Sequence, residues 1–282
     1  MSSNLPRGPR PALTASITEL VAYRSLIWNL AQREIKVKYK RSVLGWLWSL
    51  INPATQLLTY TIVFGYFFRA EPPVAGNGEL KNYSIYLFTG LVTWNFFSNT
   101  VNGCLTSMVG AGPLMKKVYF PPVCAPIATT IAVLAQTAVE FGILAAVLIV
   151  VGNVGISFLL LFPLLLVLLL FSLGVGLALS VYNVYYRDVG YLVGVALNLL
   201  FYATPIIFTL DIVPERIGRI PVLRLIRLNP LTQFVGAVRD AMYHLQAPSL
   251  ARAAGIVVVA LLALVVGWAM FHRKAADISE EL

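Results

Sequence analysis

The sequence predicts an all-α membrane protein that crosses the bilayer several times. Its 282 residues are 59% hydrophobic and 12% charged, with a mean hydropathy of +0.80, whereas a soluble domain usually has about twice that charged fraction. The segment 44–68 carries no charge, and it is long enough to cross the ~30 Å hydrocarbon core as a helix. Similar segments recur along the chain, so we expect one polytopic domain and no separate soluble domain.

Basic residues indicate which side of the membrane each segment faces. A basic run, Lys36 to Arg41, directly precedes the first uncharged segment and places its start on the cytoplasmic face. With both termini cytoplasmic, more Lys and Arg fall inside than outside, and an arginine cluster at 216–239 is the main exception. The formal net charge of +9 then reflects anchoring beside anionic lipid rather than nucleic-acid binding.

Hydropathy divides the chain into three regions. Residues 1–43 form a cytoplasmic tail and an interface helix, residues 44–271 form the membrane domain, and residues 272–282 form a cytoplasmic tail. Within the membrane domain we expect six spans, at 44–69, 83–107, 122–151, 157–186, 189–210 and 252–271. Spans of this length and composition are typical of transmembrane helices.

Three segments outside the spans have patterns of their own. Residues 17–41 have apolar and basic groups on different faces, broken near Arg24, which predicts a helix lying in the interface; an exposed surface helix is the alternative. Residues 113–120 are long enough for about two helical turns parallel to the membrane. Residues 211–248 alternate arginine with Ile and Leu, which predicts short amphipathic or re-entrant helices.

No arrangement of residues in the sequence predicts catalysis. The histidines His244 and His272 are far apart, Cys104 and Cys124 have no metal-ligand spacing, and no glycine-rich phosphate-binding motif is present. We therefore expect no catalytic residues, metal or cofactor in this chain. If ATP supplies the energy, a different chain must bind it.

Uncharged polar residues recur at helical spacing inside several spans. They could line a wet path for a hydroxyl-rich solute, or they could form hydrogen bonds between helices and stabilise the bundle. The candidate channel-lining residues are Asn52, Gln56, Thr59, Tyr60, Asn95, Asn99, Asn102, Asn198 and Tyr202.

Other residues in the spans have two interpretations each. Aromatic rings between Trp46 and Phe97 could stack on sugars or form an interfacial belt. Glu140 is the one acid deep in an apolar span, and a structural hydrogen bond or a protonated acid is favoured over a proton relay. Gly190 and Gly194 form a GxxxG pattern that permits close helix contact.

Several motifs, in order along nearly the whole chain, resemble one family. They are REIKVKYKRS at 33–42, LGWLW at 44–48, Asn52-Pro53, PLMKKVYFP at 113–121, YRD at 186–188, and NPLT at 229–232 followed by Arg239. This pattern resembles the permease subunits of type-2 ABC exporters that carry polysaccharides. That family includes the O-antigen, capsule, teichoic-acid and cell-wall galactan exporters.

The resemblance implies an architecture and a set of partners. It implies a homodimer of six-span subunits around a central channel in the bacterial inner membrane, with two separate ATPase subunits that bind ATP and Mg. The substrate would be a lipid-linked polysaccharide. The segment 211–248 would be the outer gate helices.

The resemblance also assigns roles to residues near the cytoplasmic face. A coupling helix that docks on the ATPase would contain Leu114, Met115, Lys116, Lys117, Val118, Tyr119 and Phe120. The interface helix would act as a gate, and its basic residues would attract the substrate pyrophosphate. These basic residues are Arg33, Lys36, Lys38, Lys40 and Arg41.

Other functions remain as alternatives. A permease of a drug or small-lipid exporter would share the architecture. A membrane glycosyl- or phosphotransferase that uses a polyprenyl lipid is disfavoured, because such enzymes need acids at the membrane surface and the sequence has no DxD pair. A structural or assembly protein is disfavoured because the gate and coupling segments would have no purpose.

Overall fold

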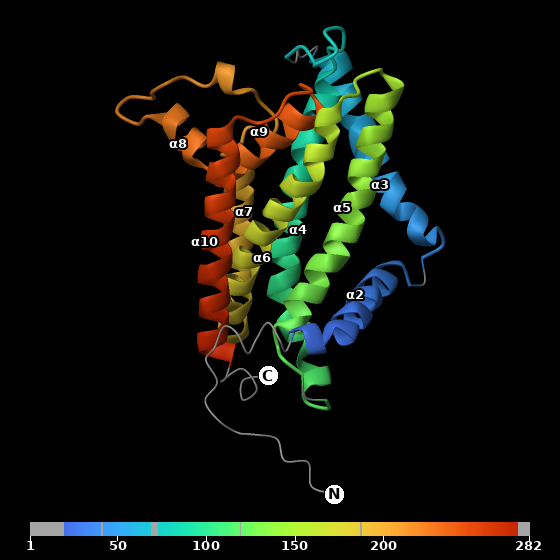
Figure 1. Ribbon diagram of the computed structural model, residues 1–282, viewed down its shortest axis with the longest axis vertical. Coiled ribbons are helices and arrows are strands. Elements are labelled where there is room, and N and C mark those ends of the chain that lie inside the picture. The colour runs from blue at the N-terminus through green and yellow to red at the C-terminus, as the bar shows by residue number, and fades with distance from the viewer. Residues whose placement is uncertain (1–19, 41, 69–72, 119, 187, 276–282) are drawn as a thin grey trace, which may run out of the picture.

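The fold is a bundle of long helices with shorter helices at both ends (Figure 1). The computed structural model describes residues 20–40, 42–68, 73–118, 120–186 and 188–275. The described residues are helical or irregular and contain no β-strand, only an isolated bridge between Ile217 and Ile220. The prediction of an all-α fold is therefore confirmed for these residues.

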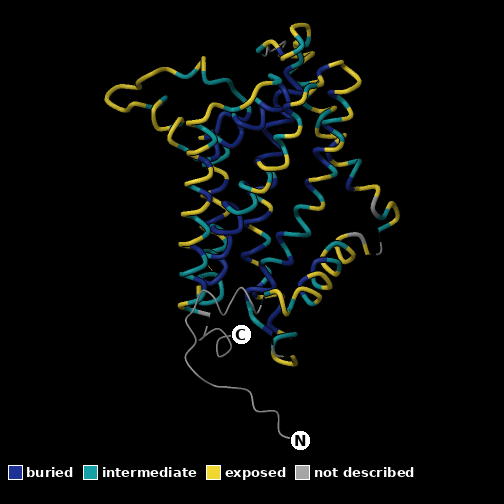
Figure 2. Tube along the Cα trace, viewed as in Figure 1, coloured by how far each residue is buried: buried dark blue, intermediate teal, exposed yellow. Residues whose placement is uncertain are grey.

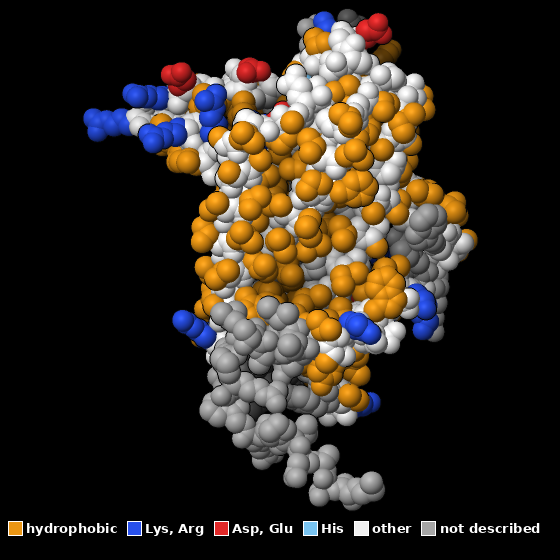
Figure 3. Space-filling view, viewed as in Figure 1, with side chains coloured by type: hydrophobic (Ala, Val, Ile, Leu, Met, Phe, Trp, Pro, Cys, Tyr) orange, Lys and Arg blue, Asp and Glu red, His pale blue; other side chains and the backbone are white. Residues whose placement is uncertain are grey.

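Three helices in the described residues are long and apolar enough to cross a membrane. They are α5 (Cys124–Val150), α6 (Leu161–Tyr185) with the 3-10 turn Ile156–Leu160 before it, and α10 (Leu250–Ala275). They coincide with the predicted spans 122–151, 157–186 and 252–271. Hydrophobic side chains cover the middle of the face shown in Figure 3, and lysines and arginines gather at its two ends, as expected for a protein that crosses a bilayer.

The first two predicted spans are also helical, but they are less apolar than the other three. The 3-10 turn Gly45–Leu47 leads into α3 (Trp48–Tyr60), which continues as a π-helical stretch, Thr61–Phe67. After it, α4 (Tyr83–Met115) packs against α5, α6 and α3. It begins at an N-cap, where the Asn82 side chain accepts hydrogen bonds from the backbone N–H groups of Ser84 and Ile85, a common way to begin a helix.

The fifth predicted span, 189–210, is wrong in its length. The helix α7 runs only over Asp188–Tyr202, 15 residues, which is about 22 Å and too short for a ~30 Å hydrocarbon core. The chain then turns inward at Thr204, Pro205 and Ile206, all buried. Proline has no N–H group to continue the helical bonding, and the carbonyl oxygens of Pro205 and Ile206 accept hydrogen bonds from the distant Arg239 instead. The full count of six spans stays a prediction.

The glycines that bring helices together are not the GxxxG pair. No atom lies within 4 Å of the position that a Cβ would take at Gly194, whereas a Cβ at Gly267 of α10 would lie 1.9 Å from the carbonyl oxygen of Gly174 in α6. These two glycines lie 93 residues apart in the sequence, so the close contact joins two helices that are distant in the chain. Close backbone approach through small residues is typical of membrane helix pairs.

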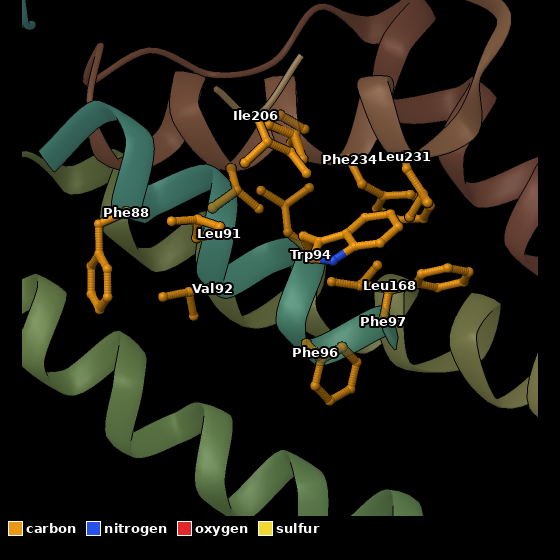
Figure 4. Close-up of a cluster of buried hydrophobic side chains, with 14 of the residues drawn as sticks. Phe88, Leu91, Val92, Trp94, Phe96, Phe97, Leu168, Ile206, Leu231 and Phe234 are labelled. Carbon is orange, nitrogen blue, oxygen red and sulfur yellow. The ribbon is translucent and has the colours of Figure 1, made fainter. Parts of the chain in front are cut away.

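The aromatic residues of α4 form the core of the bundle. Phe88, Trp94, Phe96 and Phe97 are each 6% exposed or less, and Figure 4 shows them among apolar side chains from other elements. The Phe97 ring stacks on Phe171 with ring centroids 5.5 Å apart. Both predicted roles, sugar stacking and an interfacial belt, are therefore wrong for these four residues. In the π-helical stretch, by contrast, Tyr66 and Phe67 are more than 70% exposed.

Candidate functional site

The helix α2 (Arg24–Tyr39) packs on α5 near one end of the bundle, called here the α2 end, and slants away from the bundle in Figure 1. It begins at Arg24, the residue near which the helical pattern of apolar residues in 17–41 is interrupted. Ile27 and Ala31 are buried against Cys124, Ala125 and Ala128 of α5, and the small side chains allow the two helices to approach closely. Figure 2 shows much of the remaining surface of α2 exposed. The predicted helix is therefore confirmed for the described residues, although Trp28 of its apolar set is 57% exposed, and its location in the membrane interface stays a prediction.

The predicted gate residues lie mostly on the exposed side of α2. Arg33, Lys36, Lys38 and Lys40 are exposed, and Arg33 lies 3.9 Å from Glu34. Arg41 lies outside the described residues. The exposed residues form a basic surface at the α2 end.

Lys38 connects α2 to α5. Its Nζ atom donates a hydrogen bond to Oε1 of Gln136 at 2.8 Å, and the Gln136 side chain is also hydrogen-bonded to the buried Glu140. These contacts border a cavity of about 320 Å³ between α2, α3 and α5. The structural interpretation of Glu140 is thus favoured, with Lys38 as the nearby positive charge.

The predicted coupling segment does not form a helix of its own. Instead α4 continues through Gly110, Gly112 and Pro113 to Met115, and its end projects beyond the bundle in green in Figure 1. The backbone N–H of Lys116 still reaches the carbonyl oxygen of Gly112 at 3.1 Å. The glycines therefore do not end the helix.

The residues of this segment differ in how far they are exposed. Lys116, Lys117 and Val118 are exposed, Leu114 and Met115 are half-buried, and Tyr119 lies outside the described residues. Phe120 is only 3% exposed and packs in the cluster with Ala31 and Cys124. The prediction of Phe120 as part of an exposed apolar knob is wrong, since it anchors the segment beneath α2.

The predicted channel-lining residues lie on open faces of three neighbouring helices. Asn52, Gln56 and Thr59 of α3, Asn99 and Asn102 of α4, and Asn198 and Tyr202 of α7 are exposed, while Tyr60 and Asn95 are half-buried. The helix α4 contacts both α3 and α7. The two outer helices, α3 and α7, are therefore both neighbours of α4 in the bundle.

The side chains on these faces do not join helices within the part of the chain that the structure describes. Thr59 donates to the carbonyl oxygen of Thr55 at 2.8 Å, and Asn102 donates to Oγ of Ser98 at 3.4 Å, each within its own helix. Hydrogen bonding between helices of one subunit therefore does not explain the polar stripes. Their amides and hydroxyls remain available to water, a ligand or another chain.

The opposite end of the bundle is called here the α9 end. A buried arginine, Arg239, bonds several segments to one another there, a structural role that the sequence analysis did not predict. Arg239 belongs to α9 (Pro230–Met242), which follows the short helix α8 (Val222–Leu228). It is 4% exposed, and its guanidinium lies 3.7 Å from the centre of the Tyr86 ring. A Cβ at Gly90 would lie 2.7 Å from its Nη2 atom, so the glycine leaves room for the guanidinium.

Arg239 bonds only to neutral acceptors. Nη1 donates to the carbonyl oxygen of Pro205 at 2.6 Å and to the Tyr86 hydroxyl at 3.1 Å, Nη2 donates to the carbonyl oxygen of Ile206 at 2.7 Å, and Nε donates to that of Tyr86 at 3.3 Å. The neighbouring acid, Asp240, instead pairs with Arg252 of α10. In the sequence, apolar residues lie on both sides of Arg239 in the run VGAVRDAM, and this pattern could have indicated a buried arginine.

Further polar contacts close the α9 end. Asn153 donates to the carbonyl oxygens of Met242 at 3.1 Å and Tyr243 at 3.0 Å, and Ser157 donates to that of Ala241 at 2.7 Å. Burial raises the pKa of the Tyr243 hydroxyl to about 12. Burial also lowers the pKa of His244 below its ordinary value, and the nearby Asp240 only partly opposes this effect.

Residues 25–243 match the family model of the ABC-2 type transporter. This chain belongs to the ABC-2 type transporter family. The matched range starts within α2 and ends directly after α9. It therefore includes the interface helix and the arginine-closed α9 end, as well as most of the bundle.

Several curated proteins are similar to this chain over most of its length. The chain is 27% identical to an O-antigen export system permease protein, RfbA, of Myxococcus xanthus over 94% of this chain and 98% of that protein. It is 29% identical to the O-antigen export system permease protein RfbA of Klebsiella pneumoniae over 76% of this chain and 79% of that protein. It is 25% identical to the polysialic acid transport protein KpsM of Escherichia coli over 74% and 78%, respectively.

Proposed function

We propose that this chain is the transmembrane subunit of an ATP-driven exporter that moves a lipid-linked polysaccharide out of the cytoplasm. The channel would lie between two copies of the chain in the inner membrane. The observation that carries the proposal is the set of uncharged polar side chains on the open faces of α3, α4 and α7. The relatives, an O-antigen export system permease protein and a polysialic acid transport protein, support a polysaccharide cargo.

The physical argument starts from the cost of placing amides in lipid. An amide without a hydrogen-bond partner in hydrocarbon is unfavourable by roughly 2–7 kcal/mol, so Asn99, Asn102 and Gln56 are poorly suited to face lipid tails. When a second copy covers these faces, the same side chains line a wet path. Hydroxyl-rich sugars can exchange hydrogen bonds along such a path without a fixed binding site.

The energy would come from two ATPase subunits that bind ATP and Mg beneath the α2 end. We infer that this end faces the cytoplasm, because its basic surface suits the cytoplasmic leaflet. Lys116, Lys117 and Val118 follow the end of α4 and are exposed, while Leu114 and Met115 in its last turn are half-buried; this segment would contact the ATPase. The exposed Arg33, Lys36 and Lys40 would attract the pyrophosphate of the substrate.

A cysteine-protection experiment tests the channel. The native Cys104 and Cys124 are buried, so single cysteines introduced at the surface can be labelled against a low background. With the ATPase subunits and a polysaccharide stalled in transit, we expect Asn99→Cys and Asn198→Cys to be protected from a water-soluble thiol reagent. The matched control is Leu262→Cys on α10, a residue 59% exposed on a helix that carries none of the polar faces.

Equal labelling of Asn99→Cys with and without the polysaccharide would contradict the channel. ATP-driven movement of a drug or small lipid, but of no polysaccharide, would favour the alternative permease. Orientation has its own test, in which Lys116→Cys and Glu79→Cys are labelled from each side of sealed vesicles. Labelling of both cysteines from the same side would overturn the proposed topology.

A further inference from the structure

A polar cavity of about 570 Å³ lies at the α9 end. Its walls come from α4, α8, α9, α10 and the segment that follows α7. Its volume is in the range of small-molecule sites. None of the candidate channel-lining residues borders it, so it is distinct from the polar faces of α3, α4 and α7.

The charged side chains around the cavity have an excess of arginine. Arg227, Arg239 and Arg252 line it, against two acids, Asp211 and Asp240. Asp240 is already paired with Arg252, whereas Arg239 bonds only to carbonyl oxygens and a tyrosine hydroxyl. The buried positive charge of Arg239 therefore has no acidic partner within ion-pair distance among the described residues.

Two buried groups at the cavity have unused hydrogen-bonding capacity. Thr232 lines the cavity and is 4% exposed, and its Oγ1 atom has no hydrogen-bond partner among the described residues. Arg239 has five N–H groups and uses four of them. Buried polar groups usually have a hydrogen-bond partner. Oxygen atoms of a ligand would supply the missing partners of Thr232 and Arg239.

We propose that this cavity binds an oxyanion carried on a polyhydroxyl group, such as a sugar carboxylate or a glycerophosphate. Arg227 at the mouth and the free N–H of Arg239 would meet the negative charge, and Thr232 with Gln233 would bond to hydroxyls. Arginine is well suited to carboxylates and phosphates because its planar fork donates two parallel hydrogen bonds. The anion comes either from an acidic sugar of the cargo, a source that rests on the proposed function, or from an anionic lipid headgroup.

Equilibrium binding to the full-length chain in phosphatidylcholine nanodiscs tests the proposal. The probes are D-glucuronate and its neutral counterpart D-glucose, measured by isothermal titration calorimetry. We expect glucuronate to bind at least about tenfold more tightly than glucose, because hydrogen bonds between charged groups are stronger than those between neutral groups. Equal binding of the two sugars would overturn the proposal.

Two variants and a matched control locate the binding. Arg227→Gln removes the charge at the mouth and should weaken glucuronate binding about tenfold. Thr232→Val keeps the side-chain shape without the hydroxyl and should weaken it about fivefold. Arg224→Gln, on the same helix but absent from the cavity wall, should bind like the unaltered chain. Loss of binding in the control to the same degree would show a general charge effect and overturn the site.

Competition then distinguishes the two sources of the anion. Displacement of glucuronate by phosphatidylglycerol in the nanodiscs identifies a lipid headgroup, and displacement by acidic oligosaccharide but not by the lipid identifies the cargo. The measurement needs neither ATPase nor transport. Failed binding with intact polysaccharide export would refute the cavity alone, and binding without export would refute the proposed function alone.

Discussion

The two ends of the bundle are held together by different forces. At the α9 end, Arg239, Asn153 and Ser157 donate hydrogen bonds to backbone carbonyls of segments far away in the chain. At the α2 end, Ile27 and Ala31 rest on Ala125 and Ala128 of α5 through apolar contacts, and Lys38 adds a hydrogen bond to Gln136.

This difference indicates which end of the bundle can move more easily. Hydrogen bonds to buried carbonyls have narrow geometry, and breaking them leaves groups without partners, so the α9 end should open only at a large free-energy cost. Contacts between small apolar side chains can slide and re-form at little cost. A helix held in this way can shift against α5, whereas the α9 end should stay fixed.

The largest expected effect is at the α9 end. Arg239→Met fills a similar volume without donors and leaves the carbonyls of Tyr86, Pro205 and Ile206 without their partner, which should lower stability by about 2–4 kcal/mol. The measurement is the thermal unfolding midpoint of the purified protein in detergent. Arg224→Met on the exposed side of α8 is the control. A midpoint for Arg239→Met equal to that control would show that the hydrogen bonds do not hold this end together.

The next effect is expected at the α2 end, and it should be local. Ala128→Leu inserts volume between α5 and α2, and overpacking of this kind costs roughly 1–3 kcal/mol. We expect faster backbone hydrogen exchange in α2 while the unfolding midpoint changes little. Ala138→Leu, at an exposed position of the same helix, should leave α2 protected. Global unfolding of Ala128→Leu, with no separate release of α2, would contradict the difference between the ends.

A smaller effect is expected from the hydrogen bond between α2 and α5. Lys38→Met keeps the chain length and removes the donor to Gln136, which should weaken the docking of α2 by about 0.5–1.5 kcal/mol. A double-mutant cycle with Gln136→Leu isolates the pair. Lys36→Met, on the exposed side of α2, is the control. Strictly additive effects in the cycle would show that Lys38 and Gln136 do not interact.

The smallest effect concerns pH and the α9 end. Because burial lowers the pKa of His244 in the folded protein, the unfolded chain binds more protons below its ordinary pKa of about 6.5. The free energy of unfolding should therefore fall as the pH drops below about 6.5, by no more than about 1.4 kcal/mol per pH unit for one group. His244→Asn should reduce this slope. An unchanged slope in His244→Asn would show that this histidine does not couple protonation to folding.

Local patterns in the sequence were sufficient for much of the fold. Long uncharged segments identified α5, α6 and α10, and the break near Arg24 marked the start of α2. The uncharged polar residues at helical spacing identified the faces of α3, α4 and α7 that the structure leaves exposed. These features depend on side chains within a few turns of one another, so they can be read without knowing which helices are neighbours.

Other features arose only from contacts between distant segments. Hydropathy continued past Tyr202, but Pro205 and Ile206 turn inward to meet Arg239, so α7 is short. The aromatics of α4 became core because α4 is surrounded by other helices, and Gly267 rather than Gly194 makes the close contact.

The sequence by itself determined that this is a helical membrane protein with a basic interface helix, because hydrophobic length and charge position act within each segment. Only the tertiary structure decided the role of Arg239, whose partner Tyr86 lies 153 residues away. A buried charge is stable only where several acceptors converge, and that convergence is a property of the packed bundle rather than of any one segment.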